Sequence, residues 1–436
     1  MSFLHIDSCE CTKSELDLFA LPPTQIAIER GEWVEYKPIS ALNNDSPQIE
    51  FTVPGIGEEY MDLSHTLLYL KVKVVKSDGT AISDSDVVAP VNNWMHSLFS
   101  QVDIFLNQRQ ISTPTGNYAY RAYIENILNY NSDSKSTHLK NVMFYADESS
   151  KMNEHAQNDG FKKRQALIAG SKAVEMVGHL HCDLFNHDRA LLNGVELRLR
   201  LISSRASFAL MTSTNNEYKI QFLDAALSIR KMKLNPSILI AHSKTLEKCS
   251  AKYPITRVDV KTTTLALGLR SYTVDNLING QLPKRIILGL VNNKATNGDF
   301  KTNPFNFQHY NLNYLCLYID GHQVPSRALK PDYKNSLYAE AYNTLFGGTG
   351  IHYSNHTHTI SRDDYVGGYA LYCYDLTQDL TAHLPTHWNL VRHGSVRVDL
   401  GFADAIEEPV NMILYAEYDN IIEIDKRRNV SIDFGN

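Results

Sequence analysis

The chain has 436 residues and a mass of 49.4 kDa, which is more than a single hydrophobic core usually serves, so two domains are expected. Its 42 basic and 48 acidic residues give a formal net charge of -6, which excludes a protein whose whole surface coats nucleic acid. No segment approaches the roughly 18 apolar residues of a membrane span, and the start has no signal-peptide pattern. We therefore expect a soluble product made in the cytosol.

An N-terminal arm is expected over residues 1–21. Thr12 and Glu15 fit a capping box, which predicts one helical turn over 14–20 that carries Leu16 and Phe19. A turn this short is marginal alone. Leu16 and Phe19 are therefore candidate docking residues, either on the chain's own first domain or on a neighbouring subunit, and a disordered tail is the alternative.

Strands in both halves are predicted from alternation between apolar and other residues. The clearest segments are 68–74, 195–201 and 396–400, where every second residue is Leu or Val. Asp78-Gly79 and Asp320-Gly321 are typical of two-residue hairpin turns, so the strands should pair antiparallel. Strands and helices do not alternate regularly, which predicts a mainly β protein with helical insertions.

Three helices are predicted from periodicity and capping. Residues 120–128 and 338–345 each place their Tyr, Ile, Leu or Ala side chains on one stripe. A third helix begins at Asn235-Pro236, where Asn can cap and Pro supplies the first helical φ, and extends to about Lys248. Because the sequence then returns to strand character, this helix is expected to connect two domains.

These elements predict an arm, two domains and a tail. The expected boundaries are 1–21 for the arm, 22–235 for the first domain, 236–250 for the connecting helix, 251–425 for the second domain and 426–436 for a basic C-terminal tail.

The two halves repeat one order of elements. Residues 102–112 and 315–326 each resemble a strand, a turn and a strand, and a helix follows both; further on, Asp183 is matched with Asp375. Each half holds about eight short strands, the number in a jelly roll, in which two sheets pack face to face. A pair of unrelated β-sandwiches is the alternative, because alternation alone is a weak topological signal.

Three sequence strings resemble the major capsid proteins of Polinton (Maverick) elements and adintoviruses. They are CTKSELDLFALPPTQIAIERGEWVEYKPI, VNNWMHSLFSQVDIFLNQ and YAYRAYIENILNY. The resemblance is strongest over residues 9–145 and is weaker but collinear to about residue 425. None of the matched residues is catalytic in character, so the strings indicate a lineage rather than a chemical site.

The resemblance implies a double jelly roll, a structural protein of the virion and no enzyme. Three chains would form a homotrimer, a pseudo-hexameric capsomer, and capsomers would tile an icosahedral capsid around double-stranded DNA. A separate penton protein would fill the vertices. The excursions at 113–172 and 326–360 would form the outer crown, and the arm and the C-terminal end would lie toward the interior. No catalytic residue and no cofactor is implied.

Histidines supply the candidate metal ligands. His352, His356 and His358 lie in one turn-rich stretch and could bind a divalent metal, although a polar surface loop is the simpler explanation. His179 and His181 form an HxH pattern assigned to one face of a strand, where a structural role or a pH-sensitive contact is expected. The six cysteines lack CxxC spacing and are expected to be free thiols, four of them in apolar surroundings.

Two short basic runs are candidate nucleic-acid contacts. Residues 162–164 and the run Lys426, Arg427 and Arg428 more often solvate a loop than bind a ligand. If the C-terminal run faces the capsid interior, it could contact packaged DNA through phosphates without sequence preference.

The rival interpretation comes from another class of protein. A secreted-type double jelly roll that binds glycans, or a glycan amidase on that fold, would carry a secretory signal and clustered carboxylates or aromatic residues at loop ends. The sequence shows no secretory signal and no spacing that selects a catalytic triad.

Overall fold

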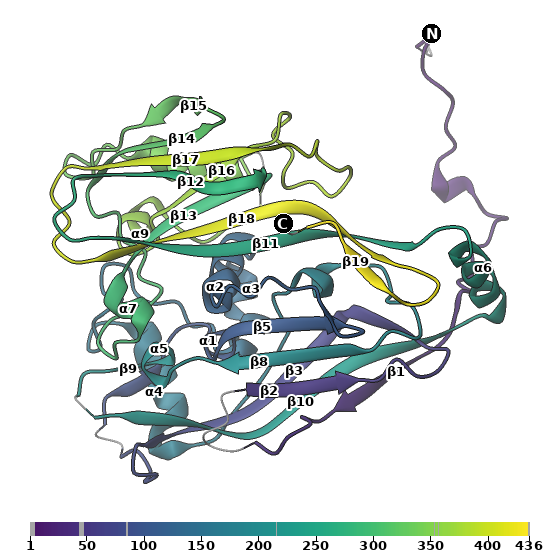
Figure 1. Ribbon diagram of the computed structural model, residues 1–436, viewed down its shortest axis with the longest axis horizontal. Coiled ribbons are helices and arrows are strands. Elements are labelled where there is room, and N and C mark those ends of the chain that lie inside the picture. The colour runs from purple at the N-terminus through teal and green to yellow at the C-terminus, as the bar shows by residue number, and fades with distance from the viewer. Residues whose placement is uncertain are drawn as a thin grey trace.

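The computed structural model describes residues 5–42, 48–83, 86–214, 216–352, 354–355 and 357–434. Figure 1 shows two β-barrels side by side, the first in purple to teal and the second in teal to yellow. Every strand pairing in the sheets is antiparallel, as the hairpin dipeptides predict.

The first barrel consists of two four-stranded sheets. One sheet contains, in spatial order, β1 (Ile28–Tyr36), β10 (Tyr218–Leu234), β3 (Tyr60–Lys76) and β7 (Val174–Gly178). The other contains β2 (Gln48–Val53), β8 (Leu197–Ser203), β5 (Phe99–Leu106) and β6 (Arg109–Gln110). A separate short pair joins β4 (Val88–Pro90) to β9 (Leu210–Thr212).

The second barrel has the same plan. One sheet contains β11 (Ala251–Leu265), β18 (Val410–Ile424), β13 (Arg285–Asn292) and β16 (Leu371–Asp375), with β19 (Val430–Ile432) added beside β18. The other contains β12 (Ser271–Gln281), β17 (His393–Phe402), β14 (Leu312–Ile319) and β15 (His322–Leu329).

The strand order is identical in the two barrels, so each is an eight-stranded jelly roll. In chain order β1, β2, β3, β5, β6, β7, β8 and β10 occupy the places of β11, β12, β13, β14, β15, β16, β17 and β18. The fold class predicted from the sequence is confirmed. Strand lengths differ from the expectation of short strands, since β3 and β10 each have 17 residues.

Alternation predicts the strand faces well because the side chains on the inner face of each sheet are buried. Leu68, Leu70, Val72 and Val74 of β3 are fully buried, and the same holds for the matching apolar face of β8. The apolar residues of both barrels form one continuous core. Burial of one face thus fixes the register, since a slip of one residue would expose that face.

The two predicted hairpins have different outcomes. Asp320 and Gly321 join β14 to β15 with φ values of 48° and 81°, so this two-residue hairpin is confirmed. Asp78 and Gly79 form a turn, but only a single bridge between Val75 and Ala81 follows it. The strands that pair with β3 in its sheet are β10 and β7, neither of which follows this turn directly, so the expected hairpin at that position is wrong.

The match between Asp183 and Asp375 is also wrong. Asp375 ends β16, whereas the equivalent strand β7 ends at Gly178 and Asp183 lies beyond it in a 3-10 turn. The two halves lack identities that could set the register, so the order of elements was predictable and the residue-by-residue match was not.

Helices fill the connections between strands. The α-helices are α1 (Trp94–Ser97), α2 (Tyr118–Asn129), α3 (Ser132–Ser136), α4 (Asp159–Ile168), α5 (Ala206–Ala209), α6 (Pro236–Leu246), α7 (Asn293–Asn297), α8 (Ala339–Thr349) and α9 (Arg362–Val366). The 3-10 turns are η1 (Ser14–Leu16), η2 (His138–Val142), η3 (Ala169–Ser171) and η4 (Asp183–Asn186). The three helices predicted from the sequence correspond to α2, α8 and α6.

The connecting helix α6 lies on the surface at one end of the molecule (Figure 1). The Asn235 side chain caps it by accepting a hydrogen bond from the Ser237 N–H at 3.0 Å, and Pro236 is its first residue. The chain after β18 is not a free tail, because it turns at 425–429 and returns as β19.

Candidate functional site

Helix α2 lies between the two barrels (Figure 1). Asn117, just before the helix, donates to the Val260 carbonyl at 2.9 Å and accepts from the Thr262 hydroxyl at 3.1 Å. From the other side, the Tyr415 hydroxyl of β18 donates to Glu125 at 3.2 Å. We call this contact, formed by α2 and η4 with β11 and β18, the seam. The resemblance implies that the whole excursion at 113–172 forms an outer crown. This expectation is wrong for α2, which is buried between the barrels.

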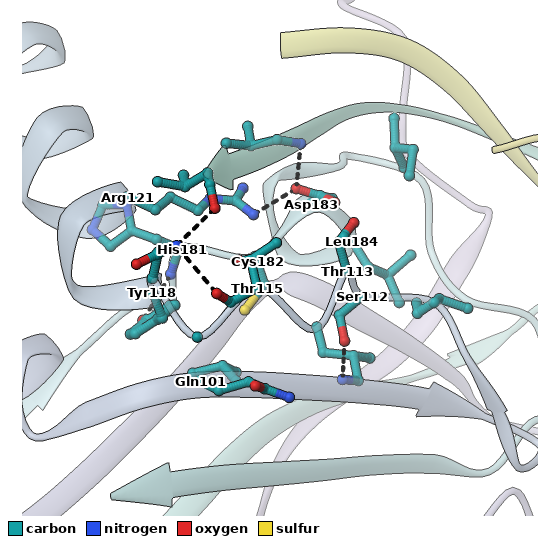
Figure 2. Close-up of a pocket in the computed structure, with 18 of the residues that line it drawn as sticks. Gln101, Ser112, Thr113, Thr115, Tyr118, Arg121, His181, Cys182, Asp183 and Leu184 are labelled. Atoms are coloured by element: carbon teal, nitrogen blue, oxygen red, sulfur yellow. Dashed lines mark hydrogen bonds and ion pairs between the residues drawn. The ribbon is translucent and has the colours of Figure 1, made fainter. Parts of the chain in front are cut away.

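A buried ionic cluster occupies the seam (Figure 2). Arg121 contacts Glu125 at 2.9 Å and Asp183 at 2.7 Å. Asp183 also accepts a hydrogen bond from the Val258 N–H of β11 at 3.2 Å. Burial alone would raise the pKa of Glu125, but Arg121 and His181 lower it to about 2. The cluster therefore holds α2, η4 and the second barrel in one geometry.

Two histidines extend the cluster into the first barrel. His181 Nδ1 lies 2.5 Å from Glu125, and the His96 ring packs edge-on to the His181 ring with 4.8 Å between centroids. Burial, and then the charges of His181 and His179, hold the pKa of His96 well below its usual value. The predicted HxH strand is wrong, because β7 ends at Gly178 and the two side chains diverge: His179 bonds the Asn186 side chain.

Aromatic stacking closes the apolar part of the seam. Tyr123 of α2 stacks on Phe305 of the second barrel, with ring centroids 4.2 Å apart and an interplanar angle of 9°. The Tyr120 hydroxyl lies 3.0 Å from the Thr296 hydroxyl. The two barrels thus share a packed, specific contact.

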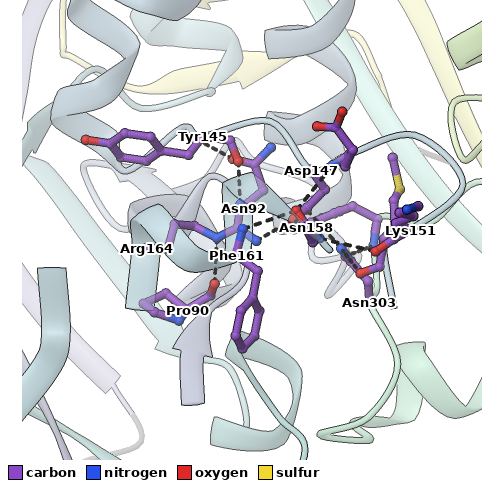
Figure 3. Close-up of polar contacts among 12 residues, drawn as sticks. Pro90, Asn92, Tyr145, Asp147, Lys151, Asn158, Phe161, Arg164 and Asn303 are labelled. Atoms are coloured by element: carbon purple, nitrogen blue, oxygen red, sulfur yellow. Dashed lines mark hydrogen bonds and ion pairs between the residues drawn. The ribbon is translucent and has the colours of Figure 1, made fainter. Parts of the chain in front are cut away.

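A second polar network joins the barrels around Arg164 (Figure 3). This side chain is fully buried; it pairs with Asp147 and donates to the Pro90 carbonyl at 2.8 Å and to the Tyr145 carbonyl. Asn303 of the second barrel donates to Asp147 at 2.9 Å. The sequence pattern predicts a solvated basic run over residues 162–164. Lys162 and Lys163 are exposed as predicted, but the prediction is wrong for Arg164.

The cavity in Figure 2 has a volume of about 40 Å³, enough for water but not for a substrate. Gln101, Tyr118, Arg121, His181 and Cys182 are among its lining residues. Burial raises the pKa of the Cys182 thiol, so the sulfur is not a thiolate nucleophile at neutral pH. The polar groups around it serve the contact between the barrels.

The structure describes two of the three candidate metal ligands. His352 is exposed, His358 is buried, and His356 lies outside the described residues. Burial lowers the pKa of His358 to about 4, and neither of its ring nitrogens has a hydrogen-bond partner among the described residues. Across the described residues, no group of three His, Cys, Asp or Glu side chains could hold a metal ion.

The C-terminal basic run occupies the turn between β18 and β19. Lys426 and Arg427 are exposed. Arg428 instead donates to the Asn193 backbone carbonyl at 2.6 Å and to its side chain at 2.9 Å, so it ties this turn to the first barrel. Only the first two residues of the run are free to contact a ligand.

The N-terminal arm extends away from the barrels (Figure 1). The predicted helical turn is the short η1, Ser14–Leu16, which is too brief to carry Phe19. Leu16 is 68% exposed and Phe19 is 97% exposed, so neither packs on its own subunit. Cys9, Cys11 and Cys249 are exposed, whereas Cys182, Cys316 and Cys373 are buried, so three cysteines are buried where four were expected in apolar surroundings.

Comparison with solved structures finds double jelly-roll capsid proteins of large viruses and virophages. A chain of the Sputnik virophage superimposes with a TM-score of 0.65 at 13% identity, covering 100% of this chain and 95% of that chain. The Faustovirus major capsid protein gives 0.55 at 10% identity, with coverage of 94% and 92%. The mavirus major capsid protein gives 0.53 at 10% identity, with coverage of 100% and 97%. At identities this low, the superpositions show that the fold is shared and nothing further.

Sequence comparison finds a full-length relative in an animal. An uncharacterised Caenorhabditis elegans protein is 27% identical over an alignment of 432 positions that covers 95% of this chain and 99% of the relative. No protein-family model matches the chain. Within the described residues, no helix is long and apolar enough to cross a membrane.

Proposed function

We propose that this chain is the major capsid protein of a double-stranded DNA virus or of a related Polinton-type element. It is a structural protein rather than an enzyme, and it acts in the virion. The observation that supports this most is the pair of equivalent jelly rolls, which share their fold over the full length with viral major capsid proteins. Three such chains supply six similar barrels, the number that a pseudo-hexameric capsomer needs.

The seam suggests how three chains close into a ring. Within one chain, the segment before α2 contacts β11 of the second barrel, and Glu125 of α2 contacts β18. If six barrels follow one repeated contact, the segment before α8 should contact β1 and β10 of the next chain. Large apolar side chains are exposed at both places: Leu337 is 67% exposed and Trp33 is 53% exposed. These two residues are the proposed centre of the trimer contact.

The mass of the purified recombinant chain tests the proposal. A stable species of three times 49.4 kDa in native mass spectrometry, and particles in electron micrographs, are expected. A monodisperse monomer that binds glycans on an array would contradict it and favour the glycan-binding alternative. In an infected cell or from an active element, vertices should contain a separate penton protein.

The exposed turn at Lys426 and Arg427 supports a contact with the packaged genome. Two adjacent, exposed positive charges on a surface turn can bind phosphate groups without reading the DNA sequence. Charge reversal at both residues should lower the amount of DNA retained in particles and leave the trimer mass unchanged. DNA retention equal to that of the unmodified chain would refute this contact. Arg428 is left unchanged, since it holds the turn to Asn193.

A further inference from the structure

A cavity beneath the connecting helix α6 has no assigned occupant. Its volume is about 420 Å³, and its floor is formed by buried apolar and aromatic side chains that include Leu192, Leu234, Tyr60 and Tyr253. The half-buried Leu246 of α6 lines it from above. His242 of the same helix bonds the Tyr60 hydroxyl at 2.9 Å, which fixes the helix over the cavity.

The rim of this cavity is basic. Arg189 and Lys252 line it. Burial raises the pKa values of Tyr60 and Tyr253, and the charge of Arg428 opposes the rise in both, so a third cation lies nearby. The acidic side chain of Glu423 lies 3.8 Å from Lys252 and offsets part of this charge. The site therefore combines an apolar floor with an excess of positive charge, which suits an acidic segment with large apolar side chains.

The N-terminal arm has that chemistry. Residues 5–21 contain four acidic side chains and one lysine. The same stretch exposes the large apolar residues Ile6, Leu16, Leu18, Phe19 and Leu21. Exposed apolar groups gathered on one segment mark an interaction site, and none of these five packs on the subunit that carries them.

We infer that the cavity under α6 receives the N-terminal arm of a second copy of this chain. The inference deepens the proposed capsid function, on which it rests, by naming a contact between copies. The arm leaves the body beside α6, and the Ala27 carbonyl at its base accepts from the Asn235 N–H. At about 3.3 Å per extended residue, residues 16–27 span up to roughly 40 Å, enough to reach a neighbouring subunit.

Native cysteines make this contact testable in the full chain. Cys249 lines the cavity and is exposed. In a background with Cys9→Ser and Cys11→Ser, the Phe19→Cys variant should form a disulfide to Cys249 between chains under mild oxidation. Equal mixtures of tagged and untagged chains show whether the bond joins two copies. The matched control is Ile39→Cys, which is also exposed but lies beyond the arm and should give under one tenth of the yield.

A charge variant tests the complementarity. Arg189→Glu with Lys252→Glu should reduce the Phe19→Cys cross-link at least several-fold, whereas Lys244→Glu, an exposed residue of α6 that does not line the cavity, should not. Adding Cys249→Ser should abolish the cross-link. An intrachain bond between residues 19 and 249 would overturn the inference by showing that the arm docks on its own subunit.

Native mass spectrometry of the same samples separates this inference from the proposed function. Trimers that form without any cross-link would overturn the arm contact and leave the capsid function standing. Chains that neither assemble nor cross-link would overturn both. A cross-link between copies in the assembled species supports both.

Discussion

Arg164 is a fully buried charge that joins three separate segments of the chain. Its guanidinium pairs with Asp147 and donates to two backbone carbonyls, all without contact to solvent. Replacing it with Met should cost about 3–5 kcal/mol in the free energy of unfolding, because Asp147 would remain buried without its cation. Denaturant unfolding measures the loss. The control is Lys163→Met on the same helix, which is exposed and should change stability by under about 0.5 kcal/mol. Equal effects would contradict the assigned role.

His96 should make the fold sensitive to acid. It is buried and neutral, so its folded-state pKa lies below the unfolded value of about 6.5. The unfolded state then binds the proton more readily, and stability is lost as the pH falls below about 6.5, by about 1.4 kcal/mol per pH unit for one proton. The stability that ionised Glu125 contributes is lost at lower pH, between pH 4.5 and about 2.

The His96→Gln variant isolates this contribution. Gln can still bond the Tyr118 hydroxyl, which lies 3.0 Å from His96 Nδ1, but it does not titrate. Unfolding curves at pH 7.5 and 5.5 should show a smaller loss for the variant than for the unmodified chain. The same loss in both would assign the acid sensitivity to other histidines, such as the buried His358 and the half-buried His309, whose pKa values burial lowers to about 4.

At the level of elements, α2 acts as a strut between the barrels. Asn117→Ala removes both hydrogen bonds to β11 and leaves the Val260 carbonyl without that donor, which should cost about 1–3 kcal/mol in unfolding free energy. Asn129→Ala, at the exposed end of the same helix, is the control and should be near neutral. If the two variants unfold alike, α2 does not couple the barrels through Asn117.

The sequence predicted elements better than the contacts between them. The stripe on 120–128 and the alternation on 68–74 follow from local periodicity, so α2 and β3 could be recognised. The position of α2 between the barrels could not, because a buried helix and a crown helix share the same stripe. Arg164 was missed for a related reason: a basic run of three looks solvated unless its tertiary partners, here Asp147 and Asn303, are known.

At the scale of the whole molecule, the repeated fold predicts where chains meet. Trp33 lies on β1, the equivalent of β11 in the other barrel, and Leu337 precedes α8, the equivalent of α2. The two residues therefore lie where a contact between chains that repeats the seam would form. A charge placed at the centre of an apolar contact must be desolvated without a partner, which typically costs several kcal/mol. Trp33→Asp and Leu337→Asp should therefore each shift the chain from trimer to monomer.

Native mass spectrometry at fixed concentration measures this shift, and circular dichroism checks that both variants stay folded, since both positions are exposed in the single chain. Ile56→Asp, which changes a still more exposed residue on the loop between β2 and β3, is the control and should remain trimeric. Trimers that persist in both variants would mean that six barrels do not share one repeated contact. A folded monomer from either variant would instead locate the trimer interface on the outer flanks of the two barrels, opposite the seam that joins them within each chain.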